Sequence, residues 1–140
     1  MFYAVKLTPI ERGEIMVTCP DLPELTTVGD NEVDALREAL DGIESTLLLY
    51  MQERRDIPEP SAPKRGQRVV QLPPLSVAKV GLYRAMRAKG LSKAELARRL
   101  GVPRPSVDRL LDLRHLSKLE QVQGALEAIG YRIELQVLAA

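Results

Sequence analysis

The segment ELARRLGVPRPSVDRLL, residues 95–111, decides how the C-terminal half of the chain folds. It begins as an amphipathic helix, breaks at Gly101, and resumes behind Pro103 and Pro105 with Arg104 between them. Proline fits the first turn of a helix, because the first N–H groups of a helix have no partner inside it. A residue before proline avoids the α region, so the second helix is expected to start at or next to Arg104. The segment therefore predicts two short helices joined by a tight turn, with an arginine at the head of the second helix.

Two helices joined by a short turn that contains glycine form the helix-turn-helix motif, whose second helix enters the major groove of DNA. The spacing of the apolar residues agrees with two helices that pack together, and several of the residues between them are basic. We therefore expect a DNA-binding unit in this half of the chain. The apolar positions are expected to be core and not site residues: Leu96, Ala97, Leu100, Val102, Val107 and Leu110.

The longer segment LSKAELARRLGVPRPSVDRLL resembles the helix-turn-helix of Cro and phage-repressor proteins, and the resemblance extends from residue 91 to about residue 131. It implies that Lys93 contacts a phosphate and that Arg104, Pro105 and Arg109 face the bases. An arginine at such a position can pair bidentately with guanine. Arg98 and Arg99 are either phosphate contacts or ordinary solvated surface. The predicted base-facing set is Arg104, Pro105, Ser106 and Arg109, and the predicted phosphate-facing set is Ser92, Lys93, Arg98, Arg99 and Arg114.

Charge is distributed unevenly along the chain. Residues 1–57 contain five basic and twelve acidic residues, a net charge of −7, whereas residues 58–140 contain fifteen basic and seven acidic residues, a net charge of +8. A basic half suits nucleic acid, and an acidic half suits a basic partner or serves only solubility. The asymmetry predicts different partners for the two halves.

The N-terminal half is expected to form a small antiparallel sheet with one long helix. FYAVKL and IMVTC predict a hairpin around Gly13, PDLPEL is expected to interrupt the sheet because proline cannot donate to a ladder, and TTV predicts a short third strand. VVQL, residues 69–72, is a possible fourth strand that returns to this sheet. A helix over about residues 32–54 is predicted from an apolar stripe formed by Leu36, Leu40, Ile43, Leu47 and Tyr50.

The chain after residue 74 reads as four helices and a final strand. Gly90, Gly101 and Gly130 are expected to end helices. Two segments match the capping-box pattern, Ser92 with Glu95 and Ser117 with Glu120. Apolar residues then alternate with polar ones, which predicts a half-buried strand without a partner in its own unit. An unpaired strand invites a second copy of the chain, so we expect a homodimer or a higher oligomer formed through Tyr131, Ile133, Leu135 and Val137.

The fold class expected from these patterns is α+β, with three parts. They are an α/β domain at 1–57 with 69–72 as a possible returning strand, a proline-rich linker at 58–74, and a helix-turn-helix domain at 75–140 for DNA binding and dimerisation. The whole chain resembles the HicB antitoxins of the helix-turn-helix branch, most recognisably in CPDLPEL, VGDN, IPEPS and LDLRHLSKLEQVQ. The resemblance implies a truncated ribonuclease H-like N-terminal domain that neutralises a small basic HicA-type mRNA-cleaving toxin. It also implies a C-terminal domain that represses the shared operon by binding double-stranded operator DNA.

Together with the negative charge, this resemblance predicts a toxin-binding set on the acidic half: Asp21, Glu32, Asp34, Glu38 and Asp41. The acids can also form only a solvated face. A metal-dependent nuclease is disfavoured, because the predicted strands contain no Asp or Glu to hold metal ions. A repressor that responds to a small ligand is the alternative function, and it would need a concave pocket with convergent polar groups.

Catalysis, cofactors and metals are not expected. The only cysteine, Cys19, is expected to be buried as a small apolar residue, and the only histidine, His115, has no second histidine or cysteine pair to share a metal. One cysteine excludes an internal disulfide, which fits a reducing cytoplasm. The longest apolar run is far shorter than the roughly 18 residues that a membrane span needs, so no membrane partner is expected.

Overall fold

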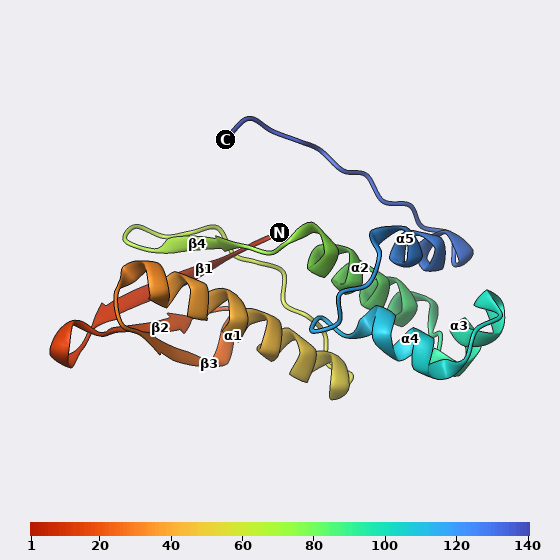
Figure 1. Cartoon of the computed structure of the whole chain (residues 1–140), viewed down its shortest axis with the longest axis horizontal. Coiled ribbons are helices and arrows are strands. Elements are labelled where there is room, and N and C mark those ends of the chain that lie inside the picture. The colour runs from red at the N-terminus through yellow and green to blue at the C-terminus, as the bar shows by residue number, and fades with distance from the viewer. The chain divides into compact units, whose positions relative to one another are not determined.

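The computed structural model describes residues 1–140 and divides the chain into two compact units (Figure 1). Unit 1 is Met1–Pro73 and unit 2 is Pro74–Ala140. Unit 1 contains a sheet and one long helix, whereas unit 2 contains four helices and an extended tail. The α+β fold class predicted from the sequence is therefore confirmed.

The sheet of unit 1 has four antiparallel strands in the order β3-β2-β1-β4. A short 3-10 turn, Glu11–Gly13, joins the first two strands, and Gly13 adopts a positive φ of 77° that suits glycine. The returning strand is present and pairs with β1 at the edge, with Tyr3 opposite Val70. The strands are β1 Phe2–Pro9, β2 Ile15–Cys19, β3 Leu22–Gly29 and β4 Arg68–Gln71.

The third strand is longer than predicted. The segment PDLPEL does not interrupt the sheet, because β3 already begins at Leu22 and contains Pro23. The ladder between β2 and β3 shifts register after Thr18, so that Thr18 pairs with Thr26 while Cys19 pairs with Leu22. Residues 23–25 therefore have no partner opposite them, and β3 lies at the sheet edge. A proline without an N–H is tolerated at such a position.

Helix α1, Glu32–Gln52, packs against the sheet and begins at an Asn31 cap, whose side chain accepts a hydrogen bond from the Asp34 N–H (Figure 1). Its buried face differs from the predicted stripe in the first half of the helix. Ala35 and Ala39 are fully buried there, while Leu36 and Leu40 are only half-buried. The second half follows the prediction, with Ile43, Leu47 and Tyr50 buried.

Close approach of the backbones explains the small residues at the start of α1. A Cβ atom added to Gly29, the last residue of β3, would lie 2.3 Å from the Ala35 backbone nitrogen. Such a distance leaves no room for a side chain at residue 29 and little room on the helix face opposite it. The sequence pattern of leucines gives no sign of this close approach.

The proline-rich segment predicted as a linker over 58–74 is held to unit 1 at several points. The Tyr3 hydroxyl donates to the Pro58 carbonyl oxygen at 2.7 Å, and the Ser61 N–H and hydroxyl both donate to the Asp21 carboxylate at 2.7 Å. Strand β4 then pairs with β1. Most of the predicted linker is therefore part of the fold of unit 1, because its extended backbone leaves polar groups available for these bonds.

Unit 2 is built from the four predicted helices. Helix α2 contacts both α4 and α5, and α3 contacts α4 and α5. Leu82, Leu96, Val107 and Val122 are fully buried at the centre of this group. The helices are α2 Pro74–Lys89, α3 Lys93–Leu100, α4 Arg104–Leu111 and α5 Leu119–Ala128. None of the helices in the chain is both long and apolar enough to cross a bilayer.

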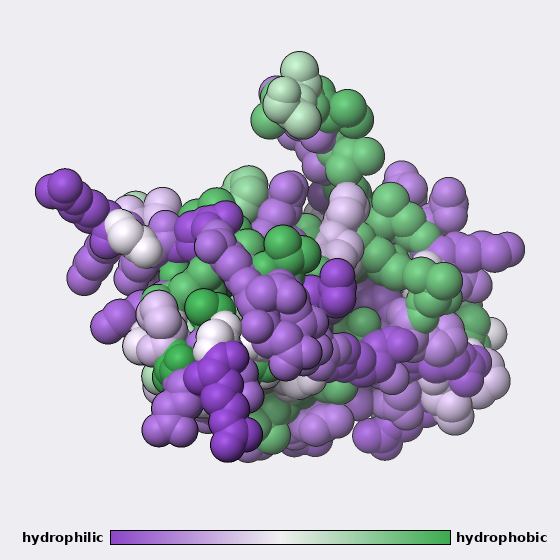
Figure 2. All heavy atoms as spheres, turned by 60° about the vertical axis from the view of Figure 1, so that its left-hand side comes forward, coloured by the Kyte–Doolittle hydropathy of each residue, from purple (hydrophilic) through white to green (hydrophobic).

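One local prediction for unit 2 is wrong, and the predicted C-terminal strand has no partner within the chain. The Ser117–Glu120 capping box is absent: the N-cap residue of α5 is Lys118, no side chain caps the helix, and the Ser117 hydroxyl donates to the Arg109 carbonyl instead. Residues 131–140 form no strand within the chain, since a strand requires a hydrogen-bonded neighbour and unit 2 is otherwise helical. The tail extends away from α5, and hydrophobic side chains lie along the projecting segment at the top of Figure 2.

Candidate functional site

Helices α3 and α4 and their turn have the local geometry that the sequence predicts. The Ser92 hydroxyl accepts a hydrogen bond from the Glu95 N–H at 3.1 Å and caps α3. Gly101 ends α3 in the left-handed conformation with a φ of 66°. Pro103 precedes α4 in an extended conformation, α4 begins at Arg104, and Pro105 occupies its first turn. The two prolines thus set the start of α4, and the Ser92 hydroxyl, predicted to face phosphate, serves as a helix cap.

The predicted base-facing residues lie together on α4. Arg104, Pro105 and Arg109 are exposed, and Ser106 is half-buried. An Arg109 guanidinium nitrogen donates to the Ser106 hydroxyl at 3.2 Å, so these two side chains are neighbours one turn apart. The arginines of α4 carry their charge at the surface of unit 2.

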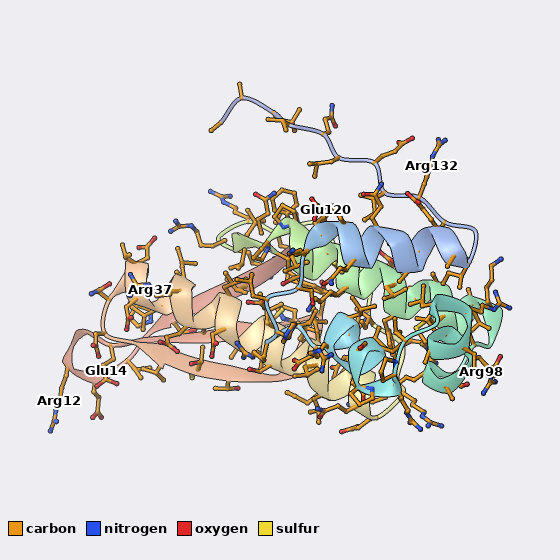
Figure 3. The ribbon with its side chains drawn as sticks, turned by 45° about the vertical axis from the view of Figure 1, so that its right-hand side comes forward. Arg12, Glu14, Arg37, Arg98, Glu120 and Arg132 are labelled. Carbon is orange, nitrogen blue, oxygen red and sulfur yellow. The ribbon has the colours of Figure 1, made fainter.

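The predicted phosphate-facing residues surround the same helix pair. Arg98 and Arg99 are exposed at the end of α3, and Figure 3 shows Arg98 extending outward from that helix. Lys93, in the first turn of α3, forms an ion pair of 2.9 Å with Asp108 of α4. Arg114 is exposed in the turn after α4. Unit 2 as a whole contains twelve basic and six acidic residues, a net charge of +6.

The predicted toxin-binding acids of unit 1 are mostly engaged within the unit itself. Glu32 pairs with Arg68 of β4, and the Asp21 carboxylate holds Ser61. The Asp34 carboxylate accepts a hydrogen bond from the Asp30 N–H at 2.9 Å, which stabilises the start of α1. Glu38 is half-buried and Asp41 is exposed on the same helix. The five acids therefore do not form one continuous unoccupied surface.

A cluster that the sequence does not predict connects β3 to the end of α1. The Tyr50 hydroxyl and the Arg55 guanidinium both donate to the Glu24 carboxylate, and the guanidinium lies 3.9 Å from the centre of the Tyr50 ring. The hydrogen bond from Tyr50 is the main cause that lowers the pKa of Glu24, with further hydrogen bonds from its own backbone and Arg55. Burial, and then the Glu24 carboxylate, raise the pKa of Tyr50.

Apolar side chains are exposed on one face of the sheet. Strand alternation places Phe2 and Val69 on the face opposite the buried Tyr3 and Val70, and Val28 follows the same alternation through the β2 ladder. Their exposed fractions are 49% for Phe2, 50% for Val69 and 42% for Val28. Unit 1 thus has an apolar surface in addition to its acids.

Comparison with known proteins identifies the family. Residues 2–81 match a family model described as HicB_like antitoxin of bacterial toxin-antitoxin system. Antitoxin HicB of Pseudomonas fluorescens (strain Pf0-1) is 47% identical over 131 residues, which cover 93% of this chain and 90% of that protein. The chain belongs to the HicB-like antitoxin family.

Two further antitoxins of this family extend the comparison. Antitoxin HicB 1 of Photorhabdus laumondii is 36% identical over 137 residues, 98% of this chain and 87% of that protein. Antitoxin HicB of Escherichia coli K12 is 33% identical over 135 residues, 96% of this chain and 98% of that protein. The family model covers unit 1 and the first half of α2, whereas the relatives align along nearly the whole chain.

The only cysteine and the only histidine of this HicB-like antitoxin each lie close to a polar group of the protein itself. Cys19 is buried as predicted, its thiol approaches the Ala4 carbonyl at 3.4 Å, and burial raises the pKa of that thiol. His115 approaches the Ser117 hydroxyl at 3.0 Å through Nδ1. No group of three or more His, Cys, Asp or Glu side chains that could hold a metal ion occurs in residues 1–140.

Lys79 is the residue that sequence reasoning missed. It lies on α2, is fully buried, and donates from Nζ to three carbonyl oxygens at the end of α4 and in the turn that follows. The sequence does contain a signal that Lys79 is buried, because it shares the spacing of one helix face with apolar and small residues. The four residues of this face are all buried: Ser76, Lys79, Val80 and Tyr83. A lysine on an apolar helix face is normally paired or hydrogen-bonded.

Proposed function

We propose that this antitoxin has two separable activities: unit 2 binds operator DNA and represses the operon, and unit 1 neutralises a HicA-type ribonuclease. The observation that carries the first activity is the α3–turn–α4 pair with exposed Arg98, Arg99 and Arg104 on a unit of net charge +6. Helix α4 is the second helix of this pair, and in a helix-turn-helix the second helix is the one that enters the major groove. Arginines at its head suit bidentate contacts to guanine.

The two proposed contact sets on unit 2 differ in what they read. Arg104 and Arg109 on α4 are proposed to contact base edges, together with Pro105 and Ser106. Arg98, Arg99, Lys93 and Arg114 are proposed to contact phosphates, which supplies affinity without sequence preference. Lys93 can exchange Asp108 for a phosphate, because an exposed ion pair is worth only about 0–1 kcal/mol.

The DNA-binding proposal is tested on the full chain with two duplexes of equal length. One carries the region upstream of the chain's own reading frame, and the other has a random sequence. We expect the upstream duplex to bind about 10³-fold more tightly or better at physiological salt. Equal affinity for the two duplexes across a salt series would reject sequence-specific repression.

The toxin-binding proposal rests on the apolar surface and the net negative charge of unit 1. Unit 1 contains eight basic and thirteen acidic residues, a net charge of −5. A ribonuclease that grips RNA carries a basic surface, which an acidic unit can occupy in place of the phosphate backbone. Phe2, Val28 and Val69 are proposed to set the residence time, because apolar contacts act mainly on dissociation. Glu38 and Asp41 are proposed to act mainly on the association rate.

The toxin-binding experiment uses the product of the adjacent reading frame and measures RNA cleavage at two salt concentrations. The full chain is compared with an Arg104→Ala and Arg109→Ala double variant, which keeps unit 1 intact. Both proteins should stop cleavage at a one-to-one ratio, and the association rate should fall at the higher salt concentration. Undiminished cleavage with excess antitoxin would reject the toxin-binding proposal.

The tail is proposed to form the dimer. Residues 131–140 form no helix or strand and follow an extended path (Figure 1), and Leu135, Val137 and Leu138 are exposed. Pairing of two tails would satisfy their backbone groups and bury these side chains. Truncation after Gly130 should give monomers in analytical ultracentrifugation, with the upstream duplex bound more weakly than by the full chain. A truncated chain that stays dimeric would reject the tail as the dimer contact.

A further inference from the structure

The side chain of Lys79 connects helix α2 to the end of helix α4. Its Nζ donates to the carbonyl oxygens of Arg109 at 3.0 Å, Asp112 at 2.7 Å and His115 at 2.6 Å. The residue has no exposed surface. All three acceptors belong to unit 2, so the arrangement does not depend on how the two units are placed.

The chemistry of an ammonium group explains this arrangement. An ammonium has three donors and no acceptor, and here each donor has one carbonyl oxygen. The Arg109 carbonyl lies in the last turn of α4, at the negative end of the helix, which suits a cation. Each of the three carbonyl oxygens also accepts one backbone N–H, and a carbonyl oxygen has a second lone pair for the ammonium. Burial lowers the pKa of Lys79, and the Asp112 charge opposes that shift. The carbonyl oxygens of α4 and its following turn therefore replace the water that a charged lysine would otherwise need.

The Arg109 backbone is the point where these bonds meet the proposed DNA surface. Its carbonyl oxygen accepts from Lys79 Nζ and also from the Ser117 hydroxyl at 3.3 Å. Its side chain is exposed and bonds to Ser106 on the outer side of α4. A residue whose backbone is fixed in this way presents its side chain from a defined position, which base recognition requires to within about 0.5 Å.

We propose that Lys79 is a positioning residue for sequence readout: it fixes the last turn of α4 so that Arg109 meets the edge of one base pair. This inference rests on the proposed DNA binding by unit 2. It assigns a role in specificity to a buried residue that does not contact DNA. Arg98 and Arg99 lie on α3, whereas the three hydrogen bonds of Lys79 go to α4 and the turn after it. Loss of Lys79 should therefore reduce sequence discrimination and leave general affinity for DNA unchanged.

The experiment compares Lys79→Met with the control Lys118→Met, which removes the same charge from an exposed position at the start of α5. The probes are the upstream duplex and the random duplex described above, measured with the full chain. Lys79→Met should reduce the ratio of the two affinities about tenfold or more, the range for one good base contact. The affinity for the random duplex should match that of Lys118→Met.

A double-mutant cycle separates positioning from a merely structural role. In an Arg109→Ala background, Lys79→Met should cause little further loss of discrimination, because the contact that it positions is already absent. Arg98→Ala serves as the second background, in which the full effect of Lys79→Met should remain. Circular dichroism and a cooperative melt confirm that unit 2 is folded in each variant.

The outcomes are distinguishable. A parent chain that binds the two duplexes equally overturns both the proposed function and this inference, whereas a parent chain that discriminates and a folded Lys79→Met that discriminates equally well overturn the inference alone. Independent losses from Lys79→Met and Arg109→Ala also overturn it. If unit 2 of Lys79→Met does not fold, the comparison is repeated with Lys79→Gln, which keeps two donors. If unit 2 of that variant does not fold either, Lys79 is a folding determinant and the positioning role is rejected.

Discussion

Units 1 and 2 use their charged residues in different ways. In unit 1, three of the five predicted toxin-binding acids are bonded to the unit itself: Asp21 to Ser61, Glu32 to Arg68, and Asp34 to the start of α1. In unit 2, the arginines of α3 and α4 are exposed at the surface. The net charge of a segment therefore indicates a class of partner, but the local bonding of each residue decides which charges are available to that partner.

Each unit also has a buried side chain with a notable polar bond, and the two side chains differ in how far their polar groups are enclosed. The Tyr50 hydroxyl of unit 1 bonds to a partly exposed carboxylate at the unit's surface, whereas Lys79 of unit 2 is enclosed completely. A buried charge is held by fixed partners, so it constrains the backbone around it more than a surface pair does. In unit 2 this enclosed charge lies beside the end of the proposed recognition helix.

Gly29→Ala should give the largest effect and should affect unit 1 alone. The new Cβ would lie 2.3 Å from the Ala35 nitrogen and 2.4 Å from its Cα, so β3 or α1 must move. Overpacking of a core usually costs about 1–3 kcal/mol, and we expect more here because the obstacle is backbone. Urea unfolding of the full chain should show unit 1 strongly destabilised, with loss of toxin inhibition.

Gly81→Ala is the matched control in unit 2. Gly81 is inside α2, and apart from the adjacent backbone of that helix no atom lies within 4 Å of a Cβ added there. The same substitution should therefore stabilise unit 2 by about 0.5–1 kcal/mol, because alanine is the better helix former. A Gly29→Ala variant that unfolds at the same urea concentration as the parent would contradict the close packing of α1 on β3.

Arg104→Ala should give the next largest effect, on function and not on stability. Loss of a base contact costs about 1–3 kcal/mol on the specific duplex, and the effect should be smaller on a random duplex. Lys93→Ala should instead weaken binding to all duplexes about equally and reduce the salt slope by about 1. Fluorescence anisotropy at several salt concentrations measures both. An equal loss on both duplexes for Arg104→Ala would move that residue from the base-facing to the phosphate-facing set.

The sequence was sufficient to predict features that depend on the local pattern of residue types and on the residues that begin or end helices. Glycines marked the ends of helices in unit 2, the Ser92 cap and the Arg104 start of α4 were predicted correctly, and residues that favour β-structure indicated β1, β2 and β4. These features depend on neighbours within a few residues. Local physics therefore determines them, and one sequence contains that information.

Features that depend on distant neighbours were predicted poorly. Pro23 lies in a strand because of a register shift against β2, and Ala35 is the buried residue because Gly29 lies against it. The partners of Lys79 are thirty or more residues away in the chain. The tail forms no strand because a strand needs a partner that a single chain of this fold does not supply. The predicted site residues remain proposals for the same reason, since their partners are other molecules.

Asp108→Asn should give a smaller effect, and it tests a charge pair at the proposed DNA surface of unit 2. Lys93 and Asp108 are 2.9 Å apart, with 44% and 49% of their side chains exposed. Removal of the carboxylate frees Lys93 and removes a charge that repels phosphate, so affinity for any duplex should rise by about 0.5–1 kcal/mol. Anisotropy with the random duplex measures the gain. Unchanged affinity and an unchanged salt slope would place this pair away from the DNA.

Glu24→Gln should give the smallest effect, limited to unit 1 at acid pH. The pKa of Glu24 is lowered, first by the Tyr50 hydrogen bond, so the folded state binds its proton less readily than the unfolded state does. The stability from this carboxylate is therefore complete above the ordinary glutamate pKa, and is lost as pH falls through the lowered value. Thermal melts over that acid range should show a shallower loss for Glu24→Gln than for the parent, while DNA binding at neutral pH stays unchanged.

Tyr50→Phe tests the cause of the lowered Glu24 pKa. The phenylalanine ring keeps the stacking surface that lies beneath the Arg55 guanidinium and removes only the hydroxyl that donates to Glu24. Without that donor the pKa of Glu24 should rise toward its ordinary value, and the acid loss of stability should become shallower as it does in Glu24→Gln. The ordinary pKa of a tyrosine hydroxyl lies far above the acid range, and burial and the Glu24 carboxylate raise it further, so the hydroxyl keeps its proton there and the parent shows the full effect. A Tyr50→Phe melt with the parent's dependence on pH would assign the shift to Arg55 and the Glu24 backbone instead.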